Sequence, residues 1–291
     1  MWIERGIFGK WEIRHIDLLR EIGVDIDGPG PKLIGVKEDG LYFSIIDKLK
    51  DAEHFREARG YAHFSDSELQ GAKSLLLHNF APNMVFSASL RKEDDSYDYL
   101  RFAFGEICEA CNHIPKGEQI KPFTLEKEPR LSSKNIWGSF HGVSGYVFTD
   151  MERFKILNSK WGLKKREVLI GAKQKVSTKF VQIDIPVSQH PLYFGNSDFG
   201  KTFKLDGSGE ISDSVEKCAE CGRPLYTNQI LDYFPSFERE FEFDVVFTQE
   251  WFGWYRRLVV SKKFAEWLID NKFVKWDSNF FIPVKDFKNQ A

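Results

Sequence analysis

Two Cys-x-x-Cys pairs constrain the fold of this chain more than any other feature. They are Cys108-Glu-Ala-Cys111 and Cys218-Ala-Glu-Cys221, and they contain all four cysteines of the 291 residues. Two residues between cysteines allow a tight turn to direct both thiolates at one ion, and two such turns complete a tetrahedral four-sulfur shell. The pairs therefore predict a structural Zn²⁺ that joins segments separated by 106 residues of chain.

Other uses of the cysteines stay open. A redox dithiol usually lies at a helix N-terminus after a strand, whereas Cys108 follows Phe104-Gly-Glu-Ile and Cys221 precedes Gly222-Arg223-Pro224. Disulfides or inert thiols are further alternatives, although four cysteines do not make a disulfide-dense scaffold. The gap between the pairs exceeds the roughly 15–20 residues of common zinc ribbons, so the pairs could share one ion or lie apart. His113 is a possible substitute ligand, but a loop histidine is the simpler interpretation.

Composition bounds the class of protein. Hydrophobic residues make up 42% of the chain and include 27 Phe, which is enough for a real core. A net charge of −2 gives no overall attraction to nucleic acid or to an anionic membrane. The N-terminus lacks the features of a signal peptide, and no apolar run approaches about 18 residues. We therefore expect a cytoplasmic protein with no membrane association.

The length suits one large domain or two modest ones. We expect an N-terminal α/β lobe over residues 1–100 and a double Cys-x-x-Cys zinc-binding domain over residues 101–291.

Local patterns in the N-terminal lobe predict several elements. Residues 11–22 have helical spacing, and residues 32–36 and 40–46 predict two strands of a hairpin. Ser65 and Glu68 match a capping box, and the helix that they begin is expected to reach about residue 78.

The rest of the chain contains a weak internal duplication. In each half, 43 positions separate the second cysteine of the pair from a phenylalanine, Phe154 or Phe264, that opens an amphipathic helix. Residues suited to cap and end these helices occur at matching positions: Asp150 and Gly162 in the first, Ser261 and Asn271 in the second. With β-like runs on either side, this predicts an α+β fold of mainly antiparallel strands and short helices. Each half would form a unit in which a Cys-x-x-Cys turn (a zinc knuckle) is followed by a strand, a helix and a strand. The structural zinc would tie the two units together.

At the cysteine pairs and the segments after them, the chain resembles the double-CXXCG family of bacterial paralogues. Cys218-Ala-Glu-Cys221-Gly222-Arg223 has the full motif, and the helix at 264–268 and the terminal strand at 280–284 follow in the family's order. The first motif has Asn112 in place of Gly, and Asn also tolerates positive φ. A longer segment than the family's precedes the first pair, so the resemblance covers residues 102–291. It implies an immunity protein that protects a cell from a toxin delivered by its kin.

No strong catalytic motif is present. The sequence lacks Gly-x-Ser-x-Gly, His-Glu-x-x-His and the phosphate-binding glycine patterns. A zinc deaminase would need His-x-Glu before Pro-Cys-x-x-Cys, and a closed four-Cys shell has no position for water. We therefore expect a binding protein and no enzyme, with an unrecognised site in residues 1–100 as the remaining enzymatic alternative.

Residues 237–244 have an acidic residue at every second position, and three of the four residues between are phenylalanines. On a strand, the acidic residues would share one face while the phenylalanines enter the core. A solvated outer face is the simpler interpretation, because like charges repel. The sharper hypothesis is an acidic surface that docks on a basic toxin and speeds association. Its members would be Glu238, Glu240, Glu242 and Asp244.

A basic stretch supports a second hypothesis, a zinc-dependent nucleic-acid-binding or regulatory protein. A solvated surface is again the simpler interpretation. The basic residues are Lys160, Lys164, Lys165, Arg166, Lys173, Lys175 and Lys179.

Overall fold

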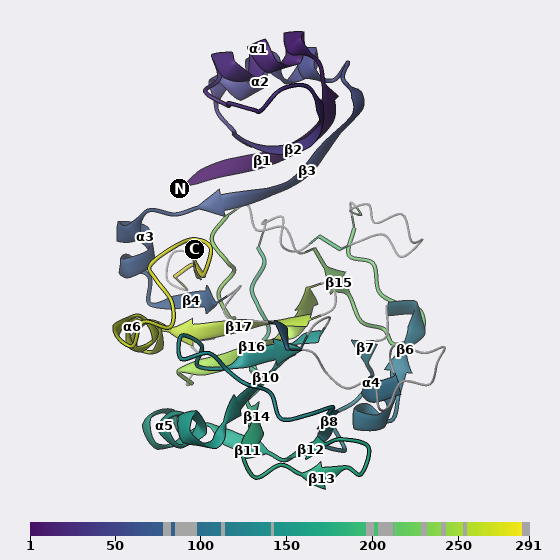
Figure 1. Cartoon of the computed structure of the whole chain (residues 1–291), viewed down its shortest axis with the longest axis vertical. Coiled ribbons are helices and arrows are strands. Elements are labelled where there is room, and N and C mark those ends of the chain that lie inside the picture. Colours follow the sequence, from purple (N-terminus) through teal and green to yellow (C-terminus); the bar gives the residue numbers. More distant parts are fainter. Residues whose placement is uncertain are drawn as a thin grey trace.

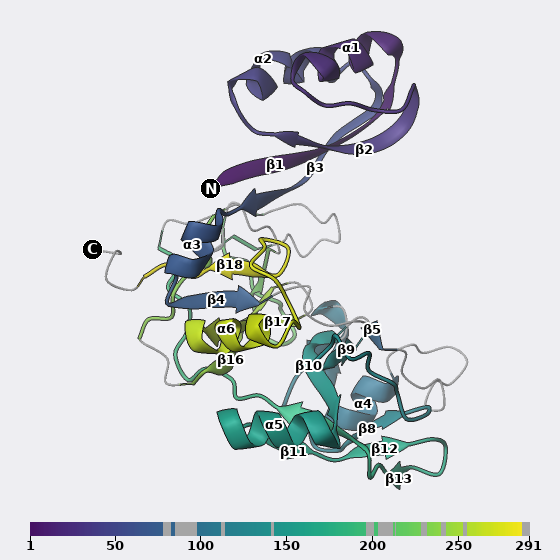
Figure 2. The ribbon, with the colours of Figure 1, turned by 60° about the vertical axis from the view of Figure 1, so that its left-hand side comes forward.

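The computed structural model has an α+β fold in which most strand pairs are antiparallel, as the sequence predicts. It describes residues 1–77, 83–84, 98–111, 114–140, 143–195, 201–202, 212, 214–227, 232–239, 243–252 and 255–286. Figures 1 and 2 show a small N-terminal lobe above a larger body.

A three-stranded antiparallel sheet and two helices form the lobe. Its strands are β1 (Trp2–Trp11), β2 (Gly30–Lys37) and β3 (Glu53–His63), in the order β2-β1-β3. The helices α1 (Ile13–Glu21) and α2 (Gly40–Leu49) lie on one side of this sheet (Figure 1). Apolar side chains of the strands and both helices fill a core of their own.

The predicted hairpin is wrong in its second half, because residues 40–46 belong to helix α2. The carboxylate of Asp39 caps this helix by accepting hydrogen bonds from the N–H groups of Leu41 (2.9 Å) and Tyr42 (3.2 Å). A short apolar run suits a strand or a helix equally, and here the cap and helical spacing decide. The buried residues of the helix are Tyr42, Ile45, Ile46 and Leu49.

The capping box at Ser65 and Glu68 is confirmed. The Ser65 hydroxyl accepts from the Glu68 N–H (3.3 Å), and the Glu68 carboxylate accepts from the Ser65 N–H (2.8 Å). The helix α3 (Asp66–Gly71) ends sooner than predicted, because the next apolar residues form strand β4 (Ser74–Leu77). This strand is buried inside a sheet, which explains its continuous apolar run.

The first sheet of the body has the order β15-β16-β17-β4-β18. β4 pairs antiparallel with both β17 and β18. The strand pairing therefore crosses the expected domain boundary at residue 100, which itself stays a prediction. The other bounds are β15 (Leu225–Tyr226), β16 (Val245–Phe252), β17 (Tyr255–Ser261) and β18 (Phe281–Pro283).

The second sheet has the order β11-β14-β10-β9-β5. Its strands are β5 (Asn83–Met84), β9 (Gly138–Phe140), β10 (Val143–Asp150), β11 (Lys164–Arg166) and β14 (Phe180–Asp184). A three-stranded sheet lies beside it, together with helix α4 (Asp98–Phe104), and shares an apolar cluster with it. Its strands are β8 (Phe123–Leu125), β12 (Val168–Ile170) and β13 (Lys175–Val176).

The two five-stranded sheets have the same topology, which confirms the predicted duplication. From one edge, β11-β14-β10-β9-β5 corresponds to β18-β4-β17-β16-β15, with three antiparallel pairs followed by one parallel pair. In each, a hairpin continues into a helix, α5 (Met151–Trp161) or α6 (Lys262–Asp270). The strand after the helix, β11 or β18, then joins the same sheet. It is separated from the hairpin by one inserted strand, β14 in one sheet and β4 in the other. Figure 2 shows both helices beside their sheets.

The predicted ends of these two helices are also confirmed. Asp150 accepts from the Arg153 N–H (2.9 Å) to cap α5, and Gly162 ends it with a φ of 64°. Ser261 accepts from the Phe264 N–H (3.1 Å) to cap α6, which ends at Asn271.

Candidate metal centre

The first Cys-x-x-Cys pair forms a small hairpin. Strand β6 (Ile107–Cys108) and strand β7 (Ile114–Pro115) pair antiparallel, and a 3₁₀ turn over Glu109–Cys111 follows β6. Cys108 ends β6 and Cys111 ends the 3₁₀ turn, and both residues are fully buried. Asn112 and His113 lie outside the described residues.

The second Cys-x-x-Cys pair lies in a turn that backbone hydrogen bonds close. The N–H of Cys218 donates to the carbonyl of Arg223 (3.0 Å), and the N–H of Gly222 donates to the carbonyl of Cys218 (2.8 Å). Gly222 has a φ of 67°, in the left-handed region that favours glycine. The glycine of the Cys-x-x-Cys-Gly motif is therefore explained by the backbone of the turn.

The tertiary structure brings all four predicted metal ligands together. The Sγ atoms of Cys108, Cys111, Cys218 and Cys221 lie within 4.8 Å of one another. Sγ of Cys108 is 3.6 Å from that of Cys218, and Sγ of Cys111 is 3.5 Å from that of Cys221. A tetrahedral ion with metal–sulfur bonds of about 2.3 Å requires sulfur–sulfur separations of about 3.8 Å. The set therefore fits one metal ion of that size.

These distances are too long for disulfides, in which the sulfurs are about 2.05 Å apart, and all four cysteines are free. The short contacts also run between the two knuckles and join chain segments far apart in sequence. Three of the sulfurs belong to buried residues, and Cys221 is half-buried.

The surroundings of the four sulfurs are mostly apolar. Leu225 and Trp251 pack against the cysteines in one buried cluster. Arg223 links the two knuckles, because its Nη1 donates to the carbonyl of Pro115 (2.8 Å). Arg223 directly follows the Cys-x-x-Cys-Gly sequence, so its position was visible in the motif. The sequence alone did not reveal that Pro115 is its hydrogen-bond partner. Figure 1 shows β6 and β7 near β15 in the body.

The pKa is raised at two of the four thiols and lowered at a third. Burial raises the pKa of the Cys108 thiol to about 12, and the carboxylate of Glu220, 3.2 Å away, contributes. Burial likewise raises the pKa of Cys111. Although burial opposes it, the Cys111 thiol and the N–H groups of Cys221 and Glu220 lower the pKa of Cys218 to about 7. Binding a metal cation would favour the thiolate at each ligand.

The predicted acidic surface is only partly described. Glu240 and Glu242 lie outside the described residues. Glu238 is exposed, whereas Asp244 is half-buried and accepts a hydrogen bond from the Ser261 hydroxyl (2.5 Å).

The predicted strand over residues 237–244 is not present in the described part of that range. Phe237 is buried as expected, but Phe243 is 46% exposed. Among the described residues of this range, Glu238, Arg239 and Asp244 lie in bends, and Phe237 forms an isolated bridge with Leu192.

The basic stretch lies mainly on the surface. Its lysines are exposed on α5, β11, β13 and their connections. Arg166 differs, since its Nε donates to Asp184 Oδ1 at 2.8 Å and it lines a cavity.

Comparison of the chain with protein-family models, curated proteins and solved structures gives no match. The relationship to the double-CXXCG family stays a prediction. Among the described residues, no helix combines the length and apolar character needed to cross a membrane.

Proposed function

We propose that Cys108, Cys111, Cys218 and Cys221 hold one structural Zn²⁺. The observation that supports this most strongly is the meeting of four free sulfurs within 4.8 Å of one another from two distant knuckles. When bound, the ion would fasten the first knuckle to the second and so stabilise the fold. With four protein sulfurs the shell is closed, so it leaves no position for a reacting water.

We further propose that the protein is a non-catalytic cytoplasmic binding protein, an immunity protein that neutralises a cognate toxin by occluding it. The resemblance to the double-CXXCG family supports this role, and a closed metal shell is consistent with it. The acidic docking surface is a part of this proposal, with exposed Glu238 as its best described member.

The metal is tested first on protein purified without reductant. We expect about one zinc per chain and no titratable thiols until a chelator is added. Cys218→Ser should lose the metal and most of the stability. Ala110→Ser is the matched control, because Ala110 is an exposed residue within the first knuckle. Four titratable thiols without metal in the native chain would remove the zinc proposal.

The binding role needs a separate experiment. The zinc-loaded chain is mixed with toxin-like proteins encoded beside its gene, and we expect a stoichiometric complex and restored growth of toxin-expressing cells. Charge reversal at Glu238 should slow association with little change in dissociation. Zinc binding without any such complex would leave the scaffold intact and reject the immunity role.

The exposed lysines favour one alternative, a nucleic-acid-binding or regulatory protein. That alternative predicts binding to DNA or RNA that weakens steeply with salt and is reduced by replacing Lys164, Lys173 and Lys175. Filter binding across a salt series separates it from the immunity role, which predicts no such binding.

A further inference from the structure

A cavity of about 580 Å³ lies beside the knuckles, between the two sheets of the body. The connection after β7, strands β10, β11 and β14, the second knuckle and the β16–β17 hairpin all contribute to its wall. This volume falls within the range of roughly 300–1,000 Å³ that is typical of small-molecule sites.

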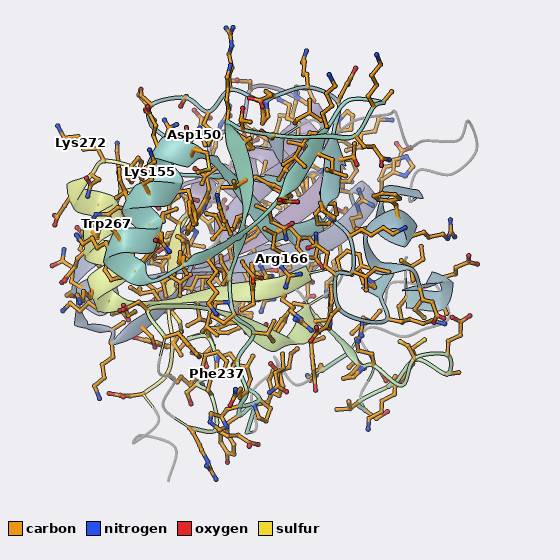
Figure 3. All side chains as sticks on the ribbon, turned by 90° about the horizontal axis from the view of Figure 1, so that it is seen from below. Asp150, Lys155, Arg166, Phe237, Trp267 and Lys272 are labelled. Carbon is orange, nitrogen blue, oxygen red and sulfur yellow. The ribbon has the colours of Figure 1, made fainter. Side chains whose placement is uncertain are left out.

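Positive charge exceeds negative charge on the cavity wall. Four cations line it, Lys116, Arg166, Arg223 and Arg256, against two carboxylates, Glu118 and Asp184. Two positive charges are therefore left without a counterpart in the wall. Arg166 is paired with Asp184, and Figure 3 shows it near the middle of the molecule seen from below. Lys116 Nζ lies 3.9 Å from Glu220, just outside the wall.

Arg223 and Arg256 are the other two cations of the wall. Both guanidinium groups lie against the ring of Trp251, with centroid distances of 5.1 Å and 5.2 Å. Neither forms an ion pair with a carboxylate in the part of the chain that the structure describes. Arg223 still donates to backbone carbonyls, whereas the buried Nε of Arg256 has no hydrogen-bond partner among the described residues.

This arrangement leaves the burial of Arg256 only partly compensated. Burial lowers the pKa of Arg256 and the positive charge of Arg223 adds to that effect, although Tyr146, Glu250 and Glu118 oppose it. The ring of Trp251 and these more distant groups do not replace the hydration that a partly buried guanidinium loses when its Nε has no hydrogen-bond partner among the described residues. An anion in the cavity would restore the missing interactions.

Neutral donors complete the polar part of the wall. Burial raises the pKa of Tyr146 well above its ordinary value, so its hydroxyl stays protonated at physiological pH. Gln119 and Gln182 are joined by amide hydrogen bonds of 2.7 Å and 3.0 Å, which position both at the wall. The apolar part comes from Phe104, Ile183, Ile185, Val187 and Phe247.

We propose that this cavity binds a small phosphomonoester, with its phosphate on Arg223 and Arg256 and its organic part against the apolar wall. A phosphomonoester carries close to two negative charges at neutral pH and offers three terminal oxygens, which match the two surplus cations and their many donors. A monocarboxylate supplies only one charge and two oxygens. The site is distinct from the four cysteines and does not depend on the proposed toxin binding.

Calorimetry on the metal-loaded full chain tests the site. The probes are adenosine monophosphate, glycerol 3-phosphate, inorganic phosphate and acetate. We expect saturable binding of at least one phosphomonoester, weaker binding of inorganic phosphate, and none of acetate, a monocarboxylate. Equal binding of inorganic phosphate would assign the site to free phosphate and overturn the organic part of the proposal. Absence of binding by every phosphate probe would overturn all of it.

Variants decide which residues hold the anion. Arg256→Gln should weaken binding roughly tenfold or more, because a charged hydrogen-bonding partner is lost. Arg256→Lys, which keeps the charge, should retain part of the affinity. Lys175→Gln is the matched control, since Lys175 is exposed on β13 outside the cavity wall and its loss should leave binding unchanged.

Zinc content is measured on every variant, because the two arginines could instead offset the charge of four thiolates. One outcome would assign the arginines to the metal centre and reject the proposal. In that outcome the wild-type chain binds no phosphomonoester and the Arg256→Gln variant loses zinc. Equal weakening by Lys175→Gln would show non-specific charge attraction and reject it as well.

Discussion

At the scale of single residues, Glu68 joins three parts of the chain. Its carboxylate accepts hydrogen bonds from the Ser65 N–H (2.8 Å), the Tyr233 hydroxyl (2.8 Å) and the terminal ammonium of Met1 (2.9 Å). Although burial opposes ionisation, the Ser65 N–H, the terminal ammonium and the hydroxyls of Ser65 and Tyr233 hold the pKa of Glu68 at about 2. The first helix of the body is thus tied to the lobe and to the segment around Tyr233.

This pKa predicts a loss of stability in acid. The ordinary pKa of a glutamate is 4.5, so the contribution of Glu68 is complete above pH 4.5 and disappears as the pH falls towards about 2. Glu68→Gln should lower the free energy of unfolding at pH 7 by about 1 kcal/mol and flatten this part of the pH profile. Urea unfolding at several pH values measures both effects. Asp66→Asn is the control, since Asp66 lies in the same turn and should leave the profile near that of the native chain.

Gly222 gives a second prediction at this scale. An added Cβ would meet no atom within 4 Å, so the positive φ alone opposes a side chain there. Gly222→Ala should cost about 1–2 kcal/mol, and Gly222→Asn less, because asparagine tolerates the left-handed region. Gly117→Ala is the matched control, because its Cβ is also unobstructed and its φ is not in that region. Thermal unfolding measures the stability of the three variants. Equal stability of all three would contradict this account.

At the scale of elements, strand β4 holds the first sheet of the body together. It is the strand inserted between β17 and β18, and Leu76 at its centre is fully buried. Leu76→Ala should lower the free energy of unfolding by roughly 2–5 kcal/mol through lost burial and a cavity. Leu33→Ala, at a leucine that is 63% exposed on β2, should change it by less than about 0.5 kcal/mol. Denaturant unfolding measures both, and a small effect at Leu76 would place β4 outside the cooperative core.

At the scale of the whole molecule, the strand pairing predicts where the chain can be divided. Residues 62–291 keep β4 and should fold and retain the metal, because the lobe has its own core. Residues 101–291 lack β4, so β17 and β18 would each expose an unpaired edge. We expect this shorter fragment to aggregate. Circular dichroism and metal content measure the difference, and a stable, metal-loaded 101–291 fragment would support a boundary at residue 100.

Much of the local structure follows from short sequence signals. The caps at Asp150, Ser261 and Ser65 were predictable because a polar side chain three residues before a helical N–H satisfies it locally. The turn at Gly222 likewise depends on residues close together in the chain. The duplicated order of strand and helix was predictable because the same spacing and the same cap positions recur after each cysteine pair. The helix at 40–46 also has a local signal, the Asp39 cap, which the apolar run outweighed in the prediction.

Tertiary structure decided the rest. The apolar run at 75–77 suits helix and strand alike, and only the two neighbouring strands of β4 distinguish them. The sequence predicted a structural metal on the four cysteines but left open whether the two pairs share one ion, because their meeting depends on the structure of the 106 intervening residues. The cationic cavity gave no sequence signal, because Arg223 and Arg256 come to lie against the same ring, that of Trp251, only when the second knuckle packs on the β16–β17 hairpin. Local patterns report on hydrogen bonds within a few residues, whereas burial and charge pairing depend on contacts that only the packed chain creates.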